Sequence, residues 1–493
     1  MNQHSLENYI VSAILTLIIA VHAYLTVLQA INLENEEVSR FHIGAKGYVS
    51  DEVWYVDAAR NILRKIFNLR PKQSGSTFNA TLVYASKEDA VKAVQYAQMY
   101  GVTVLSTEFV HLNATYVSAK SREAIEAFGK ATNAIDVVYG WVLGDAKSIN
   151  DYLNLEHPPA AKYLIALSML LLGDRPLYWR IPSIIMGVLT VLLTFFVVKR
   201  LTKYEELGLV TAAAVAVDPL VRNLASIALL DIFVTAFTLL AIFFAVSKKY
   251  KESLLILGLA ATFKFTALLA FIPILLLYIS ELIERGVNGF TEILNKSIES
   301  LLLALLSFVF FQLLVSAPII LKLGQIESGQ TGLGPWLQQS IFGALSWHLS
   351  TKCIGSNCPI ASAPWDWFFG INSFPLYIYP GGYTLYAQGF APAYTLSFIL
   401  AIFTVAYRFQ KSKPLSEKPW VILSGLFSAY LLLWIAGSRT QYSFYAVQLT
   451  PFIYIYLATQ IYEFLKRDSV IRVLISWKKF LDLLWQALLL LLG

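Results

Sequence analysis

The chain has 493 residues, of which 57% are hydrophobic and 14% charged, with a mean hydropathy of +0.59. One water-soluble core cannot bury that much apolar surface, so the composition excludes an ordinary soluble enzyme. Lipid offers no partner to backbone polar groups, so we expect an α-helical polytopic membrane protein. The net charge of +6 contains no basic block typical of nucleic-acid binding, and we expect no nucleic-acid partner.

Apolar runs predict about 10 to 11 transmembrane helices. Lysine and arginine residues gather in every second connection between these runs, which places those connections and the N-terminus in the cytosol. Residues 32–180 and 321–390 then form two large extracytosolic segments. The predicted spans are residues 9–31, 181–198, 207–221, 231–247, 252–263, 265–282, 298–320, 391–409, 420–437 and 444–465, with a weaker candidate at 475–493.

Two shorter segments predict helices that lie on the membrane surface. Residues 52–69 place apolar side chains near helical spacing with basic side chains opposite. Residues 157–173 hold only about a dozen apolar residues, too few to cross the bilayer. The predicted regions are 1–69 (first transmembrane helix and juxtamembrane helix), 70–150 (extracytosolic α/β insert), 151–320 (juxtamembrane helix and transmembrane helices), 321–390 (large extracytosolic loop) and 391–493 (C-terminal transmembrane helices).

The predicted insert contains an internal repeat. Residues 79–97 align with residues 113–131 at an offset of 34 residues, and each copy reads as strand, helix, strand. A doubled βαβ unit of this length predicts the split βαβ, or ferredoxin-like, arrangement. Asn79 and Asn113 begin N-x-T sequons on the predicted outer side, which makes both candidate glycosylation sites.

Ionisable side chains gather at the outer ends of the predicted helices and in the outer loops. A charge near lipid is costly and usually marks function or mutual pairing, and a whole group at one face exceeds ordinary snorkelling. The group comprises Asp51, Glu52, His157, Lys162, Arg180, Arg222, Asp231, Lys264, His348, Asp366 and Arg439.

Several motifs follow one another along the chain: SDEVWYVDAARNIL, HPPAAKYLIALSMLLLGDRPLYWRIP, LLDIFVTAFTLLAIFF, FKFTALLAFIPIL, SWHLS, SAPWDWFF and RTQYSFYAVQLTPFIYIYLA. Their order resembles the protein O-mannosyltransferases, members of the GT-C membrane glycosyltransferases, over most of the chain outside residues 70–150. The resemblance implies inverting transfer of a mannosyl (hexosyl) group from a polyprenyl or dolichyl phosphate to Ser or Thr of a protein, on the extracytosolic face. It also implies Asp51 as the catalytic acidic residue and Glu52 as the neighbour that engages the acceptor.

The chemistry of a lipid-linked sugar explains why such residues are needed. The lipid phosphate is a good leaving group, so no acid has to protonate the departing oxygen. One carboxylate suffices to deprotonate the acceptor hydroxyl, a contribution of about a hundred- to ten-thousandfold. Cations must stabilise the departing phosphate. The candidates for this donor site are Arg180, Lys264, His348 and Arg439.

The acidic pair has structural alternatives. Asp51 has the residue type of a helix N-cap, and Glu52 has Arg180 as a candidate ion-pair partner. Neighbouring residues on a helix point about 100° apart, so the two carboxylates cannot face the same atom.

Three further candidates also carry structural interpretations. Asp231 heads its predicted helix and fits a structural role near the site, as a cap or as a partner of Arg222. Lys264 could snorkel to the outer head groups. His157 precedes two prolines and fits a residue that holds its loop.

The outer loop adds an aromatic and a cysteine motif. Trp365 is the candidate acceptor contact, although tryptophans there also suit an interfacial belt. Cys353 and Cys358 favour a disulfide in an oxidising exterior, with two free thiols as the alternative. We find no set of metal ligands and name no metal or other cofactor, although a divalent metal stays open.

The sequence leaves three functions open besides that of a protein mannosyltransferase. They are a GT-C transferase for a lipid or glycan acceptor, a membrane transporter, and an inactive partner subunit. A transporter should carry its charges near the bilayer midplane, whereas these charges collect at one face. The expected partners are the lipid-linked sugar donor, the acceptor and the bilayer, and a homo- or hetero-dimer stays open.

Overall fold

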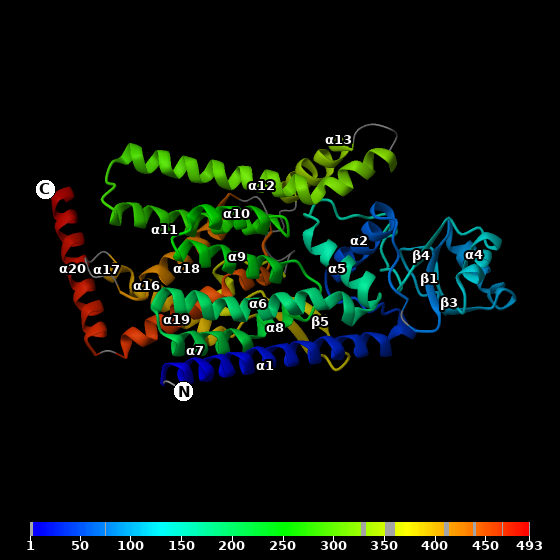
Figure 1. The fold of residues 1–493 in the computed structure, drawn as a ribbon, viewed down its shortest axis with the longest axis horizontal. Helices are drawn as coiled ribbons and strands as arrows, with labels where there is room; N and C mark the ends of the chain where they lie inside the picture. Colours follow the sequence, from blue (N-terminus) through cyan, green and yellow to red (C-terminus); the bar gives the residue numbers. More distant parts are fainter. Residues whose placement is uncertain are drawn as a thin grey trace.

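The structure is a computed structural model that describes residues 3–73, 75–326, 332–350, 360–408, 414–436, 440–465 and 467–492. Its long helices run side by side along the longest axis of the molecule (Figure 1). A small sheet with two helices projects from one end of this bundle, and the C-terminal helix α20 (Arg467–Leu492) stands across the opposite end.

The bundle is built around α6 (Pro176–Thr202), which contacts α1, α5, α7 and α9. Most residues of α9 are buried, as expected for an apolar helix enclosed by others. The principal helices besides α6 and α20 are α1 (Gln3–Ser39), α7 (Glu205–Val217), α8 (Pro219–Ala225), α9 (Asp231–Val246), α10 (Tyr250–Ala260), α11 (Phe271–Glu284), α12 (Phe290–Ile326), α16 (Ala391–Phe403), α18 (Glu417–Ile435) and α19 (Thr450–Phe464).

Five helical stretches among the described residues are long and apolar enough to cross a bilayer: Leu6–Ser39, Pro176–Thr202, Phe265–Glu284, Phe290–Leu323 and Glu417–Ile435. Helices α7 and α8 meet at 62° and would make a sixth span if counted together. The shorter apolar helices are Ala160–Leu172, Asp231–Val246 and Ala391–Phe403. The predicted α-helical membrane fold is confirmed, while the count of ten or eleven spans and their orientation stay predictions.

The predicted insert contains a four-stranded antiparallel sheet with the order β2-β3-β1-β4. This order is that of the split βαβ arrangement, so the predicted topology is confirmed. The repeat extends to the helix caps, because the hydroxyls of Ser86 and Ser121 accept hydrogen bonds from the third residue after each. The elements are β1 (Phe78–Val83), α3 (Lys87–Val94), β2 (Val102–Ser106), β3 (Ala114–Ala119), α4 (Arg122–Ala131) and β4 (Asp136–Tyr139).

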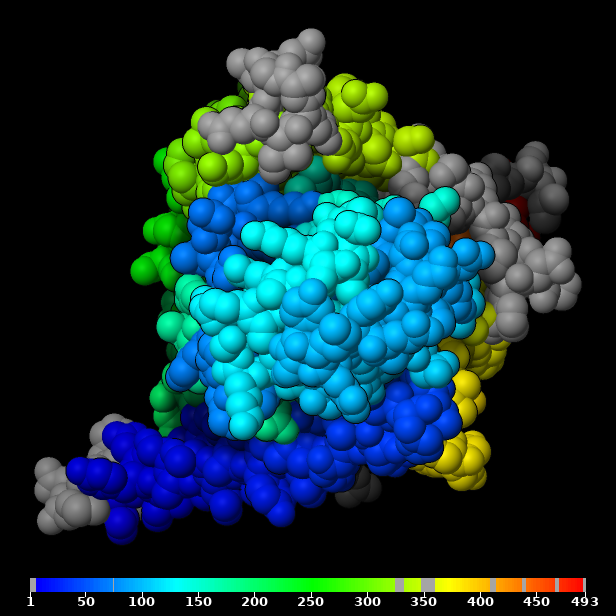
Figure 2. Space-filling view, turned by 90° about the vertical axis from the view of Figure 1, so that its right-hand side faces the viewer, coloured from blue at the N-terminus to red at the C-terminus, as the bar shows by residue number. Residues whose placement is uncertain are grey.

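The insert enters and leaves the bundle at neighbouring points. The Arg70 guanidinium, on the entering chain, lies 4.7 Å from the ring centroid of Tyr139 at the end of β4. Arg64 on the bundle side pairs with Asp136 at 2.5 Å. Figure 2 looks onto this end, where the insert covers the middle of the face and α1 runs along its lower edge.

Helix α2 and the segment that follows β4 lie between the insert and the bundle. Helix α2 (Glu52–Asn61) continues as a π-helical turn (Ile62–Ile66) and packs against α5 (Ala160–Leu172). We call residues 140–156 the connecting segment, because they lead from β4 back towards α5. The bundle also contains α13 (Leu333–Trp336), α14 (Gly343–Ser350), α15 (Asp366–Phe369) and the hairpin of β5 (Phe374–Ile378) and β6 (Thr384–Ala387).

Candidate active site

A cavity of about 790 Å³ lies where the bundle, α2 and the connecting segment meet. Asp51 and Trp54 line it from the start of α2, and residues 147–156 line it from the connecting segment. Lys264 and the segment 442–445 line it from the bundle. The cavity therefore joins residues that are several hundred positions apart in the sequence.

Asp51 immediately precedes α2 and its half-buried side chain lines the cavity. Asp51 stands at the N-cap position of α2, and among the described residues its side chain makes no capping hydrogen bond to that helix. Ser50 has a φ of +56°, a left-handed conformation that costs energy for a non-glycine residue. Backbone strain next to a cavity-lining carboxylate is typical of functional sites.

Glu52 forms a fully buried ion pair with Arg180, and both side chains are 0% exposed. Arg180 donates from Nε to Glu52 Oε1 at 2.8 Å and from Nη2 to Oε2 at 2.7 Å. Backbone N–H groups of Val49 and Ala228 also donate to Glu52, at 2.8 and 2.7 Å. Carbonyls of residues 30 and 47 accept from the remaining N–H groups of Arg180.

These contacts correct two predictions. Direct contact of Glu52 with the acceptor, and of Arg180 with the donor phosphate, does not fit the geometry. Both Glu52 oxygens and all three Arg180 nitrogens already have partners inside the protein. The structural alternative, a pair between the two, is what the structure contains. It ties the start of α2 to α6.

Lys264 lines the cavity and pairs with Asp231. The Lys264 Nζ lies 2.8 and 2.9 Å from the two carboxylate oxygens of Asp231, which heads α9. The same ammonium lies 5.3 and 4.4 Å from the ring centroids of Phe444 and Tyr445. Asp231 therefore binds Lys264 rather than the predicted partner Arg222, and the pair holds a cation at the bundle wall of the cavity.

His157 also lines the cavity, where its ring lies edge-on to Tyr55 at 5.7 Å between centroids. The backbone carbonyls near His157 accept hydrogen bonds from the buried Lys162. Lys162 Nζ donates to the carbonyl of His157 at 2.8 Å, to Asn154 Oδ1 at 3.2 Å and to the carbonyl of Asn154. These contacts favour the interpretation of His157 as part of a held loop, at a position facing the cavity.

The other predicted site residues lie elsewhere. Trp365 is 38% exposed and packs against Trp434 with 4.7 Å between ring centroids, and it is not among the described residues that line the cavity. The acceptor contact of Trp365 therefore stays a prediction. Arg439, Cys353 and Cys358 lie outside the described residues, and the side chain of His348 does too.

Aromatic residues of the cavity wall were not predicted from the sequence. They are Trp54, Tyr55, Tyr152, Phe374, Tyr442, Phe444 and Tyr445. The motif RTQYSFYAV, with its three rings beside a predicted outer helix end, was a usable signal for the last three. No local pattern marked Tyr152, because the connecting segment has no regular secondary structure.

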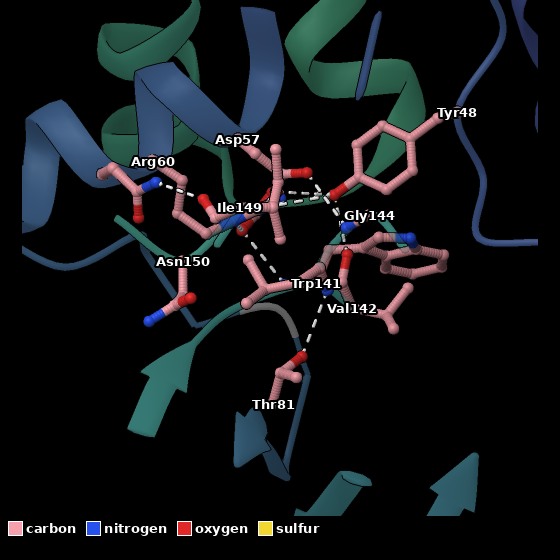
Figure 3. A network of polar contacts seen from close by, with 12 residues as sticks. Tyr48, Asp57, Arg60, Thr81, Trp141, Val142, Gly144, Ile149 and Asn150 are labelled. Atoms are coloured by element: carbon pink, nitrogen blue, oxygen red, sulfur yellow. Dashed lines mark hydrogen bonds and ion pairs between the residues drawn. The ribbon is translucent and has the colours of Figure 1, made fainter. Parts of the chain in front are cut away.

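A buried polar network holds α2 against the connecting segment (Figure 3). Asp57 Oδ1 accepts from the Tyr48 hydroxyl at 2.9 Å, and Oδ2 accepts from the backbone N–H of Gly144 at 2.9 Å. Arg60 pairs with Asp57 and also with Asp174, whose Oδ2 lies 2.6 Å from the Arg60 Nε. Burial raises the pKa of Asp57 to about 6, against the opposing effect of Arg60 and the hydrogen bonds.

Comparison with known proteins finds a family match in the middle of the chain. Residues 156–315 match the family model described as dolichyl-phosphate-mannose-protein mannosyltransferase. This range includes His157, Arg180, Asp231 and Lys264, whereas Asp51 precedes it. The chain is also similar to a polyprenol-phosphate-mannose–protein mannosyltransferase of Corynebacterium glutamicum. The identity is 28% over 139 residues, which cover 28% of this chain and 26% of the relative.

Two solved structures are similar at low sequence identity. ArnT from Cupriavidus metallidurans bound to undecaprenyl phosphate is 16% identical, covers 66% of this chain and 53% of its own, and has a TM-score of 0.41. The oligosaccharyltransferase AglB from Archaeoglobus fulgidus, in complex with an inhibitory peptide and a dolichol-phosphate, is 11% identical, covers 96% and 54%, and has a TM-score of 0.46. The chain spans about half the length of these solved chains.

The family match agrees with the resemblance that the sequence motifs carry. The matched range holds the HPP motif, the Arg180 helix and the pair of Asp231 with Lys264. Residues 156–315 of the chain are therefore similar to the dolichyl-phosphate-mannose-protein mannosyltransferase family.

Proposed function

We propose that the protein is an inverting glycosyltransferase. It moves a mannosyl (hexosyl) group from a polyprenyl or dolichyl phosphate to a Ser or Thr hydroxyl of a protein, on the extracytosolic face of the membrane. The observation that carries this proposal is that one cavity is lined both by the half-buried Asp51 and by the cation Lys264. The family match of residues 156–315 and the similarity to a polyprenol-phosphate-mannose–protein mannosyltransferase support the same reaction class.

Asp51 acts as the general base. Its carboxylate accepts the proton of the acceptor hydroxyl as the hydroxyl oxygen attacks the anomeric carbon. The bond between that carbon and the phosphate oxygen breaks, and its electron pair leaves with the lipid phosphate. Attack occurs on the face opposite the departing phosphate, so the configuration inverts. A well-placed base contributes about a hundred- to ten-thousandfold to the rate.

Lys264 stabilises the negative charge that gathers on the phosphate. Asp231 holds its ammonium on the bundle side of the cavity, beside the rings of Phe444 and Tyr445, and the Lys264 side chain is 4% exposed. A fixed cation in a site shielded from water stabilises developing charge more than one in bulk water. Glu52 and Arg180 act as positioning residues, since their pair sets where α2 begins and therefore where Asp51 lies.

The test uses membranes that contain the protein, a polyprenyl-phosphate mannose labelled in the sugar, and a Ser/Thr-rich peptide. The wild type should label the peptide, and Asp51→Asn should reduce kcat by about a hundredfold or more while folding normally. Equal transfer by both proteins would remove Asp51 from catalysis. Failure of the wild type with every lipid-linked hexose supplied would overturn the transferase itself.

A second candidate function is a transferase of the same kind that acts on a lipid or glycan acceptor. The aromatic lining of the cavity favours it, because aromatic rings stack on sugar rings as readily as they contact peptide side chains. The same assay distinguishes the two acceptors when an oligosaccharide and a polyprenyl lipid are supplied in place of the peptide. Label that appears only in these products would assign the protein to the second function.

A further inference from the structure

The cavity has two walls of different chemistry. The bundle wall holds Lys264 and the rings of residues 442–445. The other wall, which we call the outer wall, consists of Trp54 and of six residues of the connecting segment, Lys147, Ser148, Asp151, Tyr152, Asn154 and Glu156. The outer wall precedes His157, and nearly all of it lies before the range that matches the family model.

Inversion of configuration at the anomeric carbon requires donor and acceptor to approach from opposite sides, and this inference rests on the proposed function. Each substrate therefore binds at a different wall of the cavity. The isoprenoid tail of the donor stays in the bilayer, so its phosphate approaches from the helices and meets the cation at the bundle wall. Inverting displacement requires the attacking hydroxyl on the opposite face of the anomeric carbon. The acceptor therefore occupies the outer wall.

The outer wall is held by specific contacts. Asn61 on α2 donates from Nδ2 to the carbonyls of Ile149 and Tyr152, at 2.8 and 2.9 Å. The Lys162 ammonium holds the following turn, as described above. Ser148 and Asn154 have φ values of +58° and +53°, so the backbone of this wall has the left-handed conformation at two residues. Because the hydrogen bonds from Asn61 and Lys162 fix the backbone of this segment, its side chains should keep one arrangement.

Trp54 and Tyr152 form the contact surface of the outer wall. Their rings meet edge to face with 5.6 Å between centroids, and Trp54 remains 39% exposed. The Tyr152 hydroxyl bonds to Glu156, and Asn154 Nδ2 donates to the same Glu156 oxygen at 2.9 Å. An exposed apolar ring beside ordered polar side chains suits a ligand that alternates apolar groups with hydrogen-bonding groups, as an extended peptide does.

We propose that the outer wall is the acceptor-binding subsite, and that Trp54 and Tyr152 are specificity-determining residues for an unfolded peptide segment carrying the Ser or Thr. The side chain next to the acceptor hydroxyl packs on the Trp54 ring. The peptide backbone faces the polar side chains of the connecting segment. The α/β insert thereby contributes to acceptor choice through the segment that leaves its last strand.

The experiment measures KM for peptide and for donor separately. Trp54→Ala and Tyr152→Ala should each raise the KM for a Ser/Thr-rich peptide about tenfold, the equivalent of about 1.4 kcal/mol. The KM for polyprenyl-phosphate mannose, and the slow hydrolysis of that donor without peptide, should stay within about twofold of wild type. Tyr152→Phe keeps the ring and should stay near wild type in peptide KM.

The matched control is Tyr96→Ala, an exposed tyrosine of the insert that does not line the cavity. It should change neither KM. An unchanged peptide KM in both outer-wall variants, or an equal rise in donor KM, would overturn the inference while leaving the proposed transferase intact. If wild-type protein instead transfers only to a glycan, the peptide assignment of the outer wall is wrong. No transfer by the wild type to any acceptor would remove the proposed function first.

Discussion

Arg180 Nη2 lies 2.7 Å from Glu52 Oε2, in an ion pair from which solvent is excluded on both sides. The next residue towards the N-terminus, Asp51, lines the cavity. Adjacent side chains at a helix start point about 100° apart, so one acidic residue anchors the helix while its neighbour faces the cavity. The pair and the candidate base are therefore one structural unit.

Breaking the Glu52 pair should destabilise the protein strongly. Arg180→Met leaves the Glu52 carboxylate buried without its cation, a change that typically costs about 3–5 kcal/mol. Thermal unfolding in detergent should show a much lower Tm than that of the wild type. Arg175→Met is the control, because Arg175 pairs with Glu34 but its side chain is 43% exposed. Similar Tm values for the two variants would contradict a special role for the buried pair.

Variants of the Lys264–Asp231 ion pair should distinguish an effect on protein stability from an effect on donor binding. Lys264→Gln leaves Asp231 buried without its partner and should lower both stability and activity. The double variant with Asp231→Asn removes both charges, so its Tm should recover most of the loss. Its KM for the lipid-linked donor should remain raised, because the cation is still missing. Recovery of normal donor kinetics in the double variant would show that Lys264 does not act on the phosphate.

Gly144 marks the closest approach of the connecting segment to α2. A Cβ at this position would lie 2.1 Å from Val53 Cγ2 and 2.8 Å from Asp57 Oδ2. Gly144→Ala should therefore push the segment away from α2 and cost about 1–3 kcal/mol, as overpacking usually does. Gly334→Ala, whose Cβ meets no atom within 4 Å, serves as the control in the same unfolding assay. If Gly144→Ala left the free energy of unfolding unchanged, the connecting segment could shift away from α2 without loss of stability, which would contradict the prediction.

Asp57 should make stability depend on pH in acidic solution. Its pKa is about 6 in the folded protein against 3.8 for the ordinary side chain, so the folded state holds a proton that the unfolded state has released. Stability from this group is present below about pH 4 and is lost as the pH rises to about 6. Relative to Asp57→Asn, the wild type should lose up to about 3 kcal/mol over this range. Parallel stability curves for the two proteins would contradict the raised pKa.

Patterns that repeat along the chain predicted the fold well. Apolar runs marked the long helices, and the 34-residue repeat marked the split βαβ unit, including its strand order. Both signals are local, since they depend on side-chain periodicity within one element. The number of spans stays a prediction, because α9 is a short apolar helix with most of its residues buried, and hydropathy does not distinguish lipid from protein core.

The candidate site was only partly predictable for a different reason. Asp51 was found because a carboxylate before a surface helix is conspicuous at a membrane. The partner of Lys264 was missed because residues 231 and 264 meet only when α9 folds beside the chain that follows α10. Trp54 and Tyr152 meet across almost a hundred residues, so no spacing rule joins them. Tertiary contacts of this kind do not exist in the one-dimensional pattern.

The contact of Arg70 with Tyr139 means that the chain leaves for the sheet and returns from it at nearly one point. A loop of any length can bridge two neighbouring points, so the sheet can be inserted here without moving the membrane helices, and it packs on the connecting segment through residues such as Val138 and Val142. The connecting segment does not share this freedom, because it forms part of the cavity. Homologous proteins should therefore differ more in the sheet than in the connecting segment that follows it.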